Sequence, residues 1–148
     1  MIARRLKAGD DAAGAAQLLI RFFAEEHFDT RPEVITARLG TMLTLDTCGV
    51  FLAEAEGEAI GVATVSLEFG IEFGWWAEMG DLYVLPGWRG RGISRALAGA
   101  AETFLRSKGA AGYQVTVTPY ASGAHGLEQF YQKLGFSGEG RKLLSRAL

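Results

Sequence analysis

The sequence predicts a single domain of the α/β or α+β class, built around a mixed β-sheet. Its 148 residues suit one domain and leave little room for two, so we expect residues 1–148 to fold as one domain. About half of the residues (49%) are apolar, which is enough to fill a core. Strand-type and helix-type patterns follow one another in the order β-α-α-β-β-β-α-β-α-β, and this order predicts a mixed sheet with helical connections.

The first half of the chain predicts a strand, two helices and a hairpin. Alternation of side-chain type over residues 2–6 indicates a short first strand. Asp10 or Asp11 can cap the helix that follows. A second helix is expected over residues 30–43, because a proline stands in its first turn. Two runs of strand-forming residues within 48–69 flank a glycine-containing turn and predict a β-hairpin.

The second half of the chain predicts strands that alternate with helices. Pro86 stops a strand, and Gly109 and Gly135 are typical of positions just after a helix. The expected elements are, in order, a loop or strand end over 69–76, a strand over 77–86, a helix over 93–109, a strand over 112–119, a helix over 125–136 and a last strand over 141–148.

Composition excludes several classes of function. The formal net charge of -2 leaves no surplus of cations to neutralise phosphates, so we expect no nucleic-acid partner. One cysteine, and two histidines at no ligand spacing, predict neither a disulfide nor a metal site. No apolar stretch approaches the roughly 20 residues that a membrane span needs. We therefore expect a soluble, cytoplasmic protein with no membrane partner.

Residues 82–97, LYVLPGWRGRGISRAL, lead from a strand to a helix over a basic, glycine-rich turn. The N-terminus of a helix presents free amide hydrogens and the positive end of the helix dipole. Glycines just before it let a ligand approach the backbone closely. The segment therefore predicts a cradle for a pyrophosphate. The alternative is a tight turn that carries solvated arginines.

Two well-known phosphate cradles do not fit the chain, and a third pattern does. The string GxxxxGK[ST] is missing, and Arg95 stands where the dinucleotide fingerprint needs its third glycine. Residues 89–94, RGRGIS, match instead the pattern of the GCN5-related N-acetyltransferases: Arg or Gln, any two residues, Gly, any residue, then Gly or Ala. Residues 130–136, FYQKLGF, resemble the hydrophobic-Tyr-x-x-x-Gly-Phe helix end of that family. The chain is similar to the family from about Cys48 to the C-terminus.

The resemblance implies the fold of this family, called GNAT: a mixed, mostly antiparallel central sheet flanked by helices, with splayed fourth and fifth strands. It also implies acetyl-CoA as cosubstrate, beside the absence of a metal that the composition predicts. Two positions depart from the family: Ser94 replaces the usual Gly or Ala, and Ala124 stands where a cofactor-contacting asparagine is common.

The implied cofactor site has two parts. The pyrophosphate would lie on amides at the start of the helix after the turn, and the pantetheine arm along the backbone of the fourth strand. The implied cofactor-binding residues are Leu82, Tyr83, Val84, Arg89, Gly90, Arg91, Gly92, Ile93, Ser94 and Arg95.

The resemblance further implies direct transfer of the acetyl group to an amine. Glu78 stands at the position of the family's carboxylate base, and Asp81 is a rival base or a substrate anchor. An odd number of residues separates them, so a regular strand would point them to opposite faces, and a bulge would bring both to the cleft. Tyr131 is implied as the proton donor to the leaving thiolate. The alternatives are solvated carboxylates at a strand edge and a core tyrosine.

Acidic and aromatic residues crowd the stretch from 68 to 81, which suits a polycationic, hydroxylated amine. The same stretch resembles the strand-loop-strand of small aminoglycoside acetyltransferases. That resemblance implies an aminoglycoside acceptor, acetylated at the 6'-amine, and a role in antibiotic resistance. The candidate substrate-binding residues are Glu68, Glu72, Trp75, Trp76, Glu78 and Asp81.

Several alternatives stay open. The acceptor could be a polyamine, a small metabolite or a protein amine, and the domain could be a non-catalytic CoA-binding module. An RNA-binding domain would use Arg89, Arg91 and Arg95, although the overall acidity argues against it. The aromatic residues could instead pack against a partner subunit. Together with the predicted last strand they favour a homodimer, which a monomer mass measured by light scattering would contradict.

Overall fold

The computed structural model describes residues 2–148, which form two compact units that divide after Thr116. The second unit is Val117–Leu148. The elements of the first unit are β1 (Ile2–Leu6), α1 (Ala13–Glu25), α2 (Pro32–Met42), β2 (Cys48–Ala55), β3 (Glu58–Gly70), β4 (Gly74–Val84), the 3-10 turn η1 (Pro86–Trp88), α3 (Ile93–Ser107) and β5 (Tyr113–Val115).

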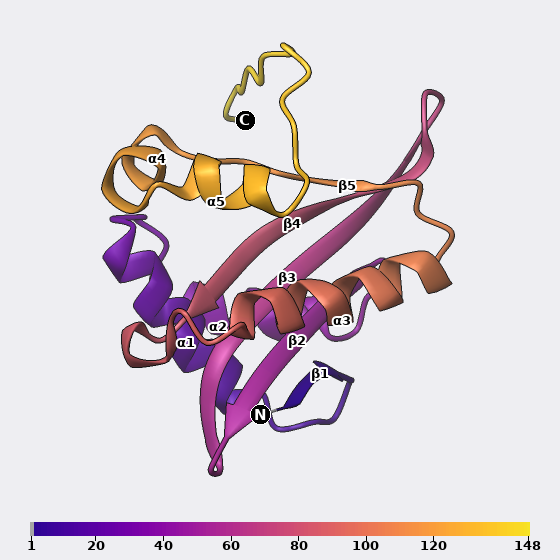
Figure 1. Cartoon of the computed structure of the whole chain (residues 1–148). Helices are drawn as coiled ribbons and strands as arrows, with labels where there is room; N and C mark the ends of the chain where they lie inside the picture. Colours follow the sequence, from indigo (N-terminus) through magenta and orange to yellow (C-terminus); the bar gives the residue numbers. More distant parts are fainter. Residues whose placement is uncertain (1) are drawn as a thin grey trace. The chain divides into compact units, whose positions relative to one another are not determined.

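The first unit is built on a five-stranded sheet in the order β1-β2-β3-β4-β5. The first three pairings are antiparallel, and β4 pairs with β5 in parallel. In Figure 1, α3 lies across one face of this sheet, and α1 and α2 lie on the other. The predicted mixed, mostly antiparallel sheet flanked by helices is therefore confirmed.

Each face of the sheet has its own apolar core. Under α3, Phe51 and Met79 from the strands pack with Leu97 from the helix. Under α1 and α2, Leu52 and Tyr83 pack with the apolar sides of both helices. This division shows which side chains of a strand point to which face, because neighbours in a strand alternate.

Local sequence explains the early elements. The carboxylate of Asp11 accepts a hydrogen bond from the backbone N–H of Ala13 (2.9 Å), so one of the two predicted aspartates does cap the start of α1. Glu56 and Gly57 both have positive φ, as the turn of a tight hairpin between β2 and β3 requires. Pro32 opens α2, as expected.

The later chain follows the predicted order with some corrections. The strand expected over 112–119 is confined to Tyr113–Val115. The loop or strand end expected over 69–76 is confirmed, as the end of β3, a turn at 71–73 and the start of β4. The second unit contains α4 (Pro119–His125), which was not predicted, and α5 (Leu127–Lys133). The hydroxyl of Thr118 caps α4 by accepting from the N–H of Ala121 (3.1 Å).

The last strand expected over 141–148 is wrong, because these residues form no regular structure. A strand needs a neighbouring strand to pair with, whatever side chains it carries. Among the residues of the second unit, 117–148, none forms a strand. Separately, none of the helices in the described residues is long and apolar enough to cross a membrane.

Candidate active site

A β-bulge in β4 brings two carboxylates to one face of the sheet. Thr64 pairs with Asp81 and Val65 with Met79, so Gly80 has no partner of its own in β3. In a regular strand, two side chains three residues apart point to opposite faces. The extra residue at the bulge shifts the alternation by one position, so that they point to the same face. Glu78 and Asp81 therefore both lie on the α1–α2 face. The sequence allowed two arrangements, opposite faces in a regular strand or one shared face with a bulge, and the structure has the bulge.

Each carboxylate is held by a threonine from a neighbouring strand or its continuation. The hydroxyl of Thr64, which is 2% exposed, donates to the Asp81 carboxylate (2.5 Å). The hydroxyl of Thr116 donates to the Glu78 carboxylate (2.9 Å). The two threonines restrict the rotamers of both acids.

The environment of Asp81 favours its neutral form. Burial raises the pKa of this carboxyl above its usual value, and the negative charge of Glu78 adds to the rise. The hydrogen bond from Thr64 opposes the shift without cancelling it. The two acids are thus close enough to influence each other, which is typical of paired carboxylates in functional sites.

An aromatic residue extends this face toward the hairpin tip. The indole of Trp76 stacks on Phe73 (4.6 Å between centroids) and donates to the side chain of Gln114 (3.1 Å). Gly112 makes room for it, since a Cβ there would lie 2.7 Å from the indole ring. Trp76 and Glu78 alternate with the buried Ala77, so they share a face.

Not all six predicted substrate residues come together. Glu68 pairs with Trp76 across the hairpin and shares its face with Glu78 and Asp81. Trp75 points to the opposite face, where its ring meets that of Phe69 (5.1 Å between centroids). Glu72 lies in the turn between β3 and β4. The structure thus groups four of the six, Glu68, Trp76, Glu78 and Asp81, on one surface, which we call the acidic face.

The predicted cradle has the geometry of an anion site. Gly90 (φ +75°) and Gly92 (φ +80°) both adopt the left-handed conformation that favours glycine. A Cβ at either position would meet nothing within 4 Å, so the space beside the turn is open. Gly92 is the N-cap of α3, where no side chain caps the helix, and the first-turn amides of Ile93, Ser94 and Arg95 are directed away from the helix body. These features fit a phosphate group.

The edge of β4 beside the cradle is open on one side. β5 pairs only with Ala77–Met79. Beyond Met79, β4 keeps β3 as its only strand neighbour within residues 2–148, through Leu82, Tyr83 and Val84. The backbone that the sequence assigned to the pantetheine arm is therefore at an unpaired strand edge.

The three arginines at this turn and the start of α3 take different positions. The Arg89 side chain turns back and donates through Nε to the carbonyl of Val84 (2.9 Å), while a second nitrogen pairs with Glu25 (3.3 Å). Arg91 lies over the ring of Trp88 (4.8 Å to its centroid), and Arg95 is exposed in the first turn of α3. Of the three, only Arg89 has a carboxylate partner among the described residues.

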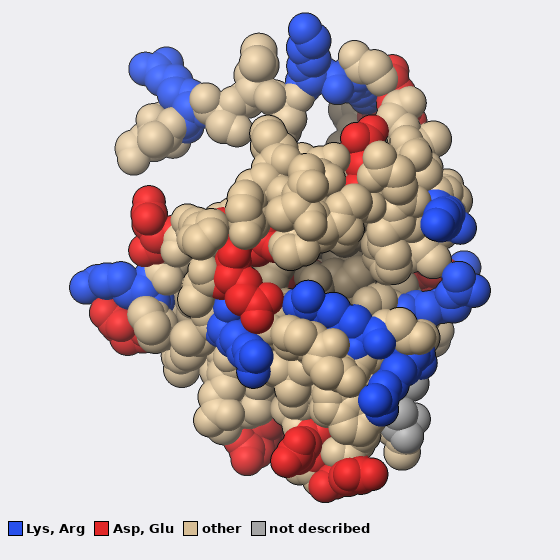
Figure 2. Space-filling view, turned by 60° about the vertical axis from the view of Figure 1, so that its left-hand side comes forward, with Lys and Arg blue, Asp and Glu red and all other residues tan. Residues whose placement is uncertain are grey.

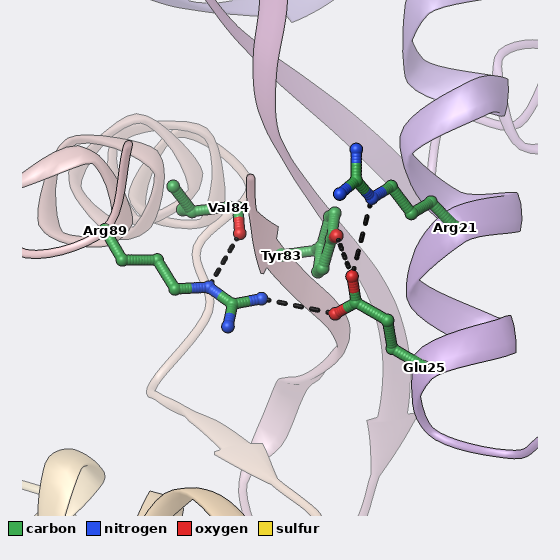
Figure 3. Close-up of polar contacts among 5 residues, drawn as sticks. All are labelled: Arg21, Glu25, Tyr83, Val84 and Arg89. Atoms are coloured by element: carbon green, nitrogen blue, oxygen red, sulfur yellow. Dashed lines mark hydrogen bonds and ion pairs between the residues drawn. The ribbon is translucent and has the colours of Figure 1, made fainter. Parts of the chain in front are cut away.

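Glu25, at the end of α1, connects several of these groups (Figure 3). Its carboxylate accepts from the Tyr83 hydroxyl (2.7 Å) and pairs with Arg89 and Arg21. Burial would raise the pKa of Glu25, but these hydrogen bonds and positive charges outweigh it and hold the pKa below its usual value. Burial, and then the carboxylate of Glu25, raise the pKa of Tyr83 to about 12.

Tyr131 lies in the second unit, on α5. Its side chain is 8% exposed and has Phe130 and Phe136 as ring neighbours (both 5.3 Å between centroids). Burial raises the pKa of its hydroxyl to about 12, so it is protonated at neutral pH. A proton donor needs that state.

Sequence reasoning missed Glu25, Thr64 and Thr116. Thr64 contacts Asp81 from β3, Thr116 contacts Glu78 from just after β5, and Glu25 lies 64 residues before Arg89. No local motif marks such partners. A buried threonine in the middle of a hydrophobic strand was the one available signal, since Thr64 interrupts an apolar run.

Fold and site together have the features of a class of proteins that hold a phosphate-bearing ligand: an uncapped helix N-terminus after a glycine-rich turn, beside a strand edge with no strand neighbour. The chain matches the model of the Acetyltransferase (GNAT) family over residues 13–136, and it belongs to that family. The family uses acetyl-CoA. Among curated proteins, none matches the chain significantly.

Solved structures with the same fold cover nearly the whole chain. A putative acetyltransferase from Arthrobacter sp. FB24 is 29% identical, with a TM-score of 0.81, over 100% of this chain and 96% of its own. An integron cassette protein from the mobile metagenome of Cole Harbour Salt Marsh is 23% identical (TM-score 0.83; 99% and 90%). The aminoglycoside N-acetyltransferase AAC(6')-Iy in complex with CoA is 21% identical (TM-score 0.83; 98% and 93%).

Proposed function

We propose that this protein is an acetyl-CoA-dependent N-acetyltransferase that acts on a primary amine of a small, cationic molecule, with an aminoglycoside as the first choice and its 6'-amine as the acceptor. The observation that carries the proposal is the bulge at Gly80. It puts Glu78 and Asp81 on one face, directly beside the point where β5 leaves β4. Proton-accepting groups and an open strand edge thus lie next to each other.

Acetyl-CoA supplies an acetyl group activated as a thioester. The amides at the start of α3 would hold its pyrophosphate, supported by Arg91 and Arg95. The unpaired edge of β4 from Leu82 to Val84 would hold its pantetheine arm by backbone hydrogen bonds. The open space beside Gly90 and Gly92 supports this assignment.

Glu78 is the proposed base. An amine is protonated at neutral pH and must lose a proton before it can attack a carbonyl, and a placed carboxylate can accept that proton directly or through water. The threonine contact from Thr116 orients Glu78 for this role. Asp81, held by Thr64, is proposed to anchor the cationic acceptor and stays the rival base. Such assistance is typically worth about 10²–10⁴-fold in rate.

Tyr131 is the proposed proton donor to the departing thiolate. Its raised pKa supports a protonated hydroxyl in the working pH range. This role comes from the family resemblance of residues 130–136. We also propose that the whole chain is one acetyltransferase domain, because the family match runs across the division at Thr116.

The acidic face supports a cationic acceptor. Glu68, Glu78 and Asp81 can pair with several amino groups, and the indole of Trp76, which stacks on Phe73, adds an aromatic side chain beside them. One structural neighbour was solved with the bisubstrate analogue CoA-S-monomethyl-acetylneamine. Its low identity (21%) makes that neighbour a guide to the choice of test substrates.

The experiment is CoA release from acetyl-CoA, measured by thiol detection, across aminoglycosides, polyamines and peptides. Glu78→Gln, Asp81→Asn and Tyr131→Phe are compared with wild type. We expect turnover with an aminoglycoside and a fall of about 10²-fold or more in Glu78→Gln. Turnover with polyamines or peptides alone would remove the aminoglycoside assignment. Tight acetyl-CoA binding without turnover of any amine would favour a non-catalytic module.

A further inference from the structure

Arg89, the first residue of the cradle motif, is held by groups that belong to the fold. Its guanidinium contacts the Val84 carbonyl and the Glu25 carboxylate, and lies 5.6 Å from the centroid of the Tyr83 ring. Figure 3 shows Glu25 between Arg89 on one side and Tyr83 and Arg21 on the other. We call Glu25, Tyr83 and Arg89 the clasp.

The clasp joins three elements that meet only in the tertiary structure. Glu25 is the last residue of α1, Tyr83 is near the end of β4, and Arg89 follows η1 and opens the turn into α3. Tyr83 is 3% exposed and packs on Phe22 of α1 (5.4 Å between centroids), so its hydroxyl is a firm partner for Glu25. The Glu25 carboxylate is thus fixed by the hydroxyl of the buried Tyr83 and in turn holds Arg89, whose side chain is more exposed.

We propose that Glu25 is a positioning residue of the acetyl-CoA site, which acts through Arg89 to hold the glycine-rich turn ready for the pyrophosphate. The inference rests on the proposed function. Two flexible glycines follow Arg89 closely, and glycine loses more conformational freedom on ordering than any other residue. When Arg89 is held in place, only residues 90–92, between Arg89 and the start of α3, are left to be ordered by the ligand.

The clasp should act on cosubstrate binding and not on the chemical step. A turn that is ordered in advance avoids an entropy cost when the ligand binds. Once acetyl-CoA is bound, its own contacts hold the turn, and the acids Glu78 and Asp81 are untouched by the change. Loss of Glu25 should therefore raise the KM for acetyl-CoA and leave kcat nearly unchanged.

The chain offers a matched control on α3. Glu102 accepts from the hydroxyl of Tyr113 (2.9 Å) and from Arg106 (3.1 Å), so it makes the same types of contact away from the turn. Glu25→Ala and Glu102→Ala remove equivalent networks. Glu25→Gln serves as a milder variant, because its amide oxygen can still accept from Tyr83. Arg21→Ala removes an outer partner of Glu25 and keeps the clasp.

The experiment measures CoA affinity by calorimetry for each variant, with thermal stability of the free protein beside it. We expect Glu25→Ala to weaken CoA binding about tenfold, close to 1.4 kcal/mol, and Glu102→Ala and Arg21→Ala to leave it within about twofold. Arg89→Ala should weaken CoA binding to a similar extent, and the double variant Glu25→Ala/Arg89→Ala should be no worse than Arg89→Ala alone. Kinetics with an active acceptor should show the change in KM for acetyl-CoA.

Other outcomes separate the two proposals. Wild-type protein that fails to bind CoA would overturn the proposed function and this inference with it. Wild type that binds CoA, with Glu25→Ala and Glu25→Gln both equal to it, would overturn the inference alone. Tighter CoA binding by Glu25→Ala would also overturn it, because Glu25 would then compete with the phosphate for Arg89.

Discussion

At the scale of single residues, the surroundings of Asp81 disfavour the charged form of its carboxyl group. It is partly buried, lies near the like charge of Glu78, and receives a side-chain hydrogen bond from Thr64. Such residues often occur in functional sites, where they lower the stability of the free protein. A binding site needs groups whose charge or hydrogen bonds are fully compensated only when the ligand is bound. A cationic acceptor would supply the missing positive charge.

The raised pKa of Asp81 gives a prediction with a defined sign. A carboxyl whose pKa is higher in the folded protein than its ordinary 3.8 contributes stability that is present below pH 3.8 and is lost as pH rises through the folded value. Asp81→Asn keeps an acceptor for Thr64 and removes the buried charge. We expect this variant to melt higher than wild type at neutral pH and to lose turnover.

The check is a series of thermal melts across pH. The advantage of Asp81→Asn should shrink as the pH falls and disappear below pH 3.8, where Asp81 is protonated in both states. A variant that is less stable than wild type at neutral pH would show that the charge of Asp81 is already compensated.

At the scale of elements, the turn before α3 depends on glycine for backbone conformation and not for space. Gly92 has φ +80°, and a Cβ added there would meet nothing within 4 Å, whereas Gly99, within α3, is equally open without a positive φ. Comparing Gly-to-Ala changes at the N-cap of this helix and in its interior therefore isolates the effect of the positive φ on stability.

We predict opposite effects for these two changes. Gly92→Ala forces a left-handed alanine and should lower the free energy of unfolding by roughly 1–2 kcal/mol. Gly99→Ala should raise it by about 0.5–1 kcal/mol, because alanine is the better helix former. Urea unfolding of both variants tests this, and changes of the same sign would remove the argument.

Elements also show where sequence patterns fail. Strand-forming residues correctly located β1 to β4, each of which pairs with a neighbour in the sheet. The residues at 141–148 predicted a strand that does not form. A strand at 141–148 would need a pairing strand from another part of the chain. The side-chain pattern of the segment itself does not reveal whether such a strand exists.

At the scale of the whole molecule, the face drawn in Figure 2 carries charges of both signs. Figure 2 shows basic and acidic side chains interspersed on the face in view, with neither sign covering it. This distribution suits a small ligand held by a local group of charges, and the face in view offers no continuous basic surface of the kind that nucleic acids need. The homodimer stays a prediction, supported by the exposed aromatic and aliphatic residues Phe69 and Ile71 at the β3–β4 hairpin.

The single-domain proposal predicts one cooperative unfolding transition for the whole chain. If residues before and after Thr116 fold as one unit, the calorimetric and van't Hoff enthalpies should agree. Differential scanning calorimetry, repeated with CoA, is the measurement. Two separate transitions would show that the chain folds as two independent parts.

The sequence by itself determined the order of the elements up to α3, the glycine-rich turn before α3 and the family. These follow from local patterns: alternation, capping and turn residues, and a contiguous motif at 89–94. It also identified Glu78 and Asp81 but left their relative direction open. That direction depends on which residue of β4 lacks a partner in β3, and strand pairing alone decides it.

Only the tertiary structure decided what the side chains of the site contact. Arg89 looked like a phosphate ligand in the motif, yet its guanidinium binds Glu25 and the Val84 carbonyl. Thr64 lies 17 residues from Asp81, and Glu25 lies 58 from Tyr83. The first contact arises from the pairing of β3 with β4, and the second from the packing of α1 against the sheet. The free energy of that packing is shared among many residues with no motif of their own.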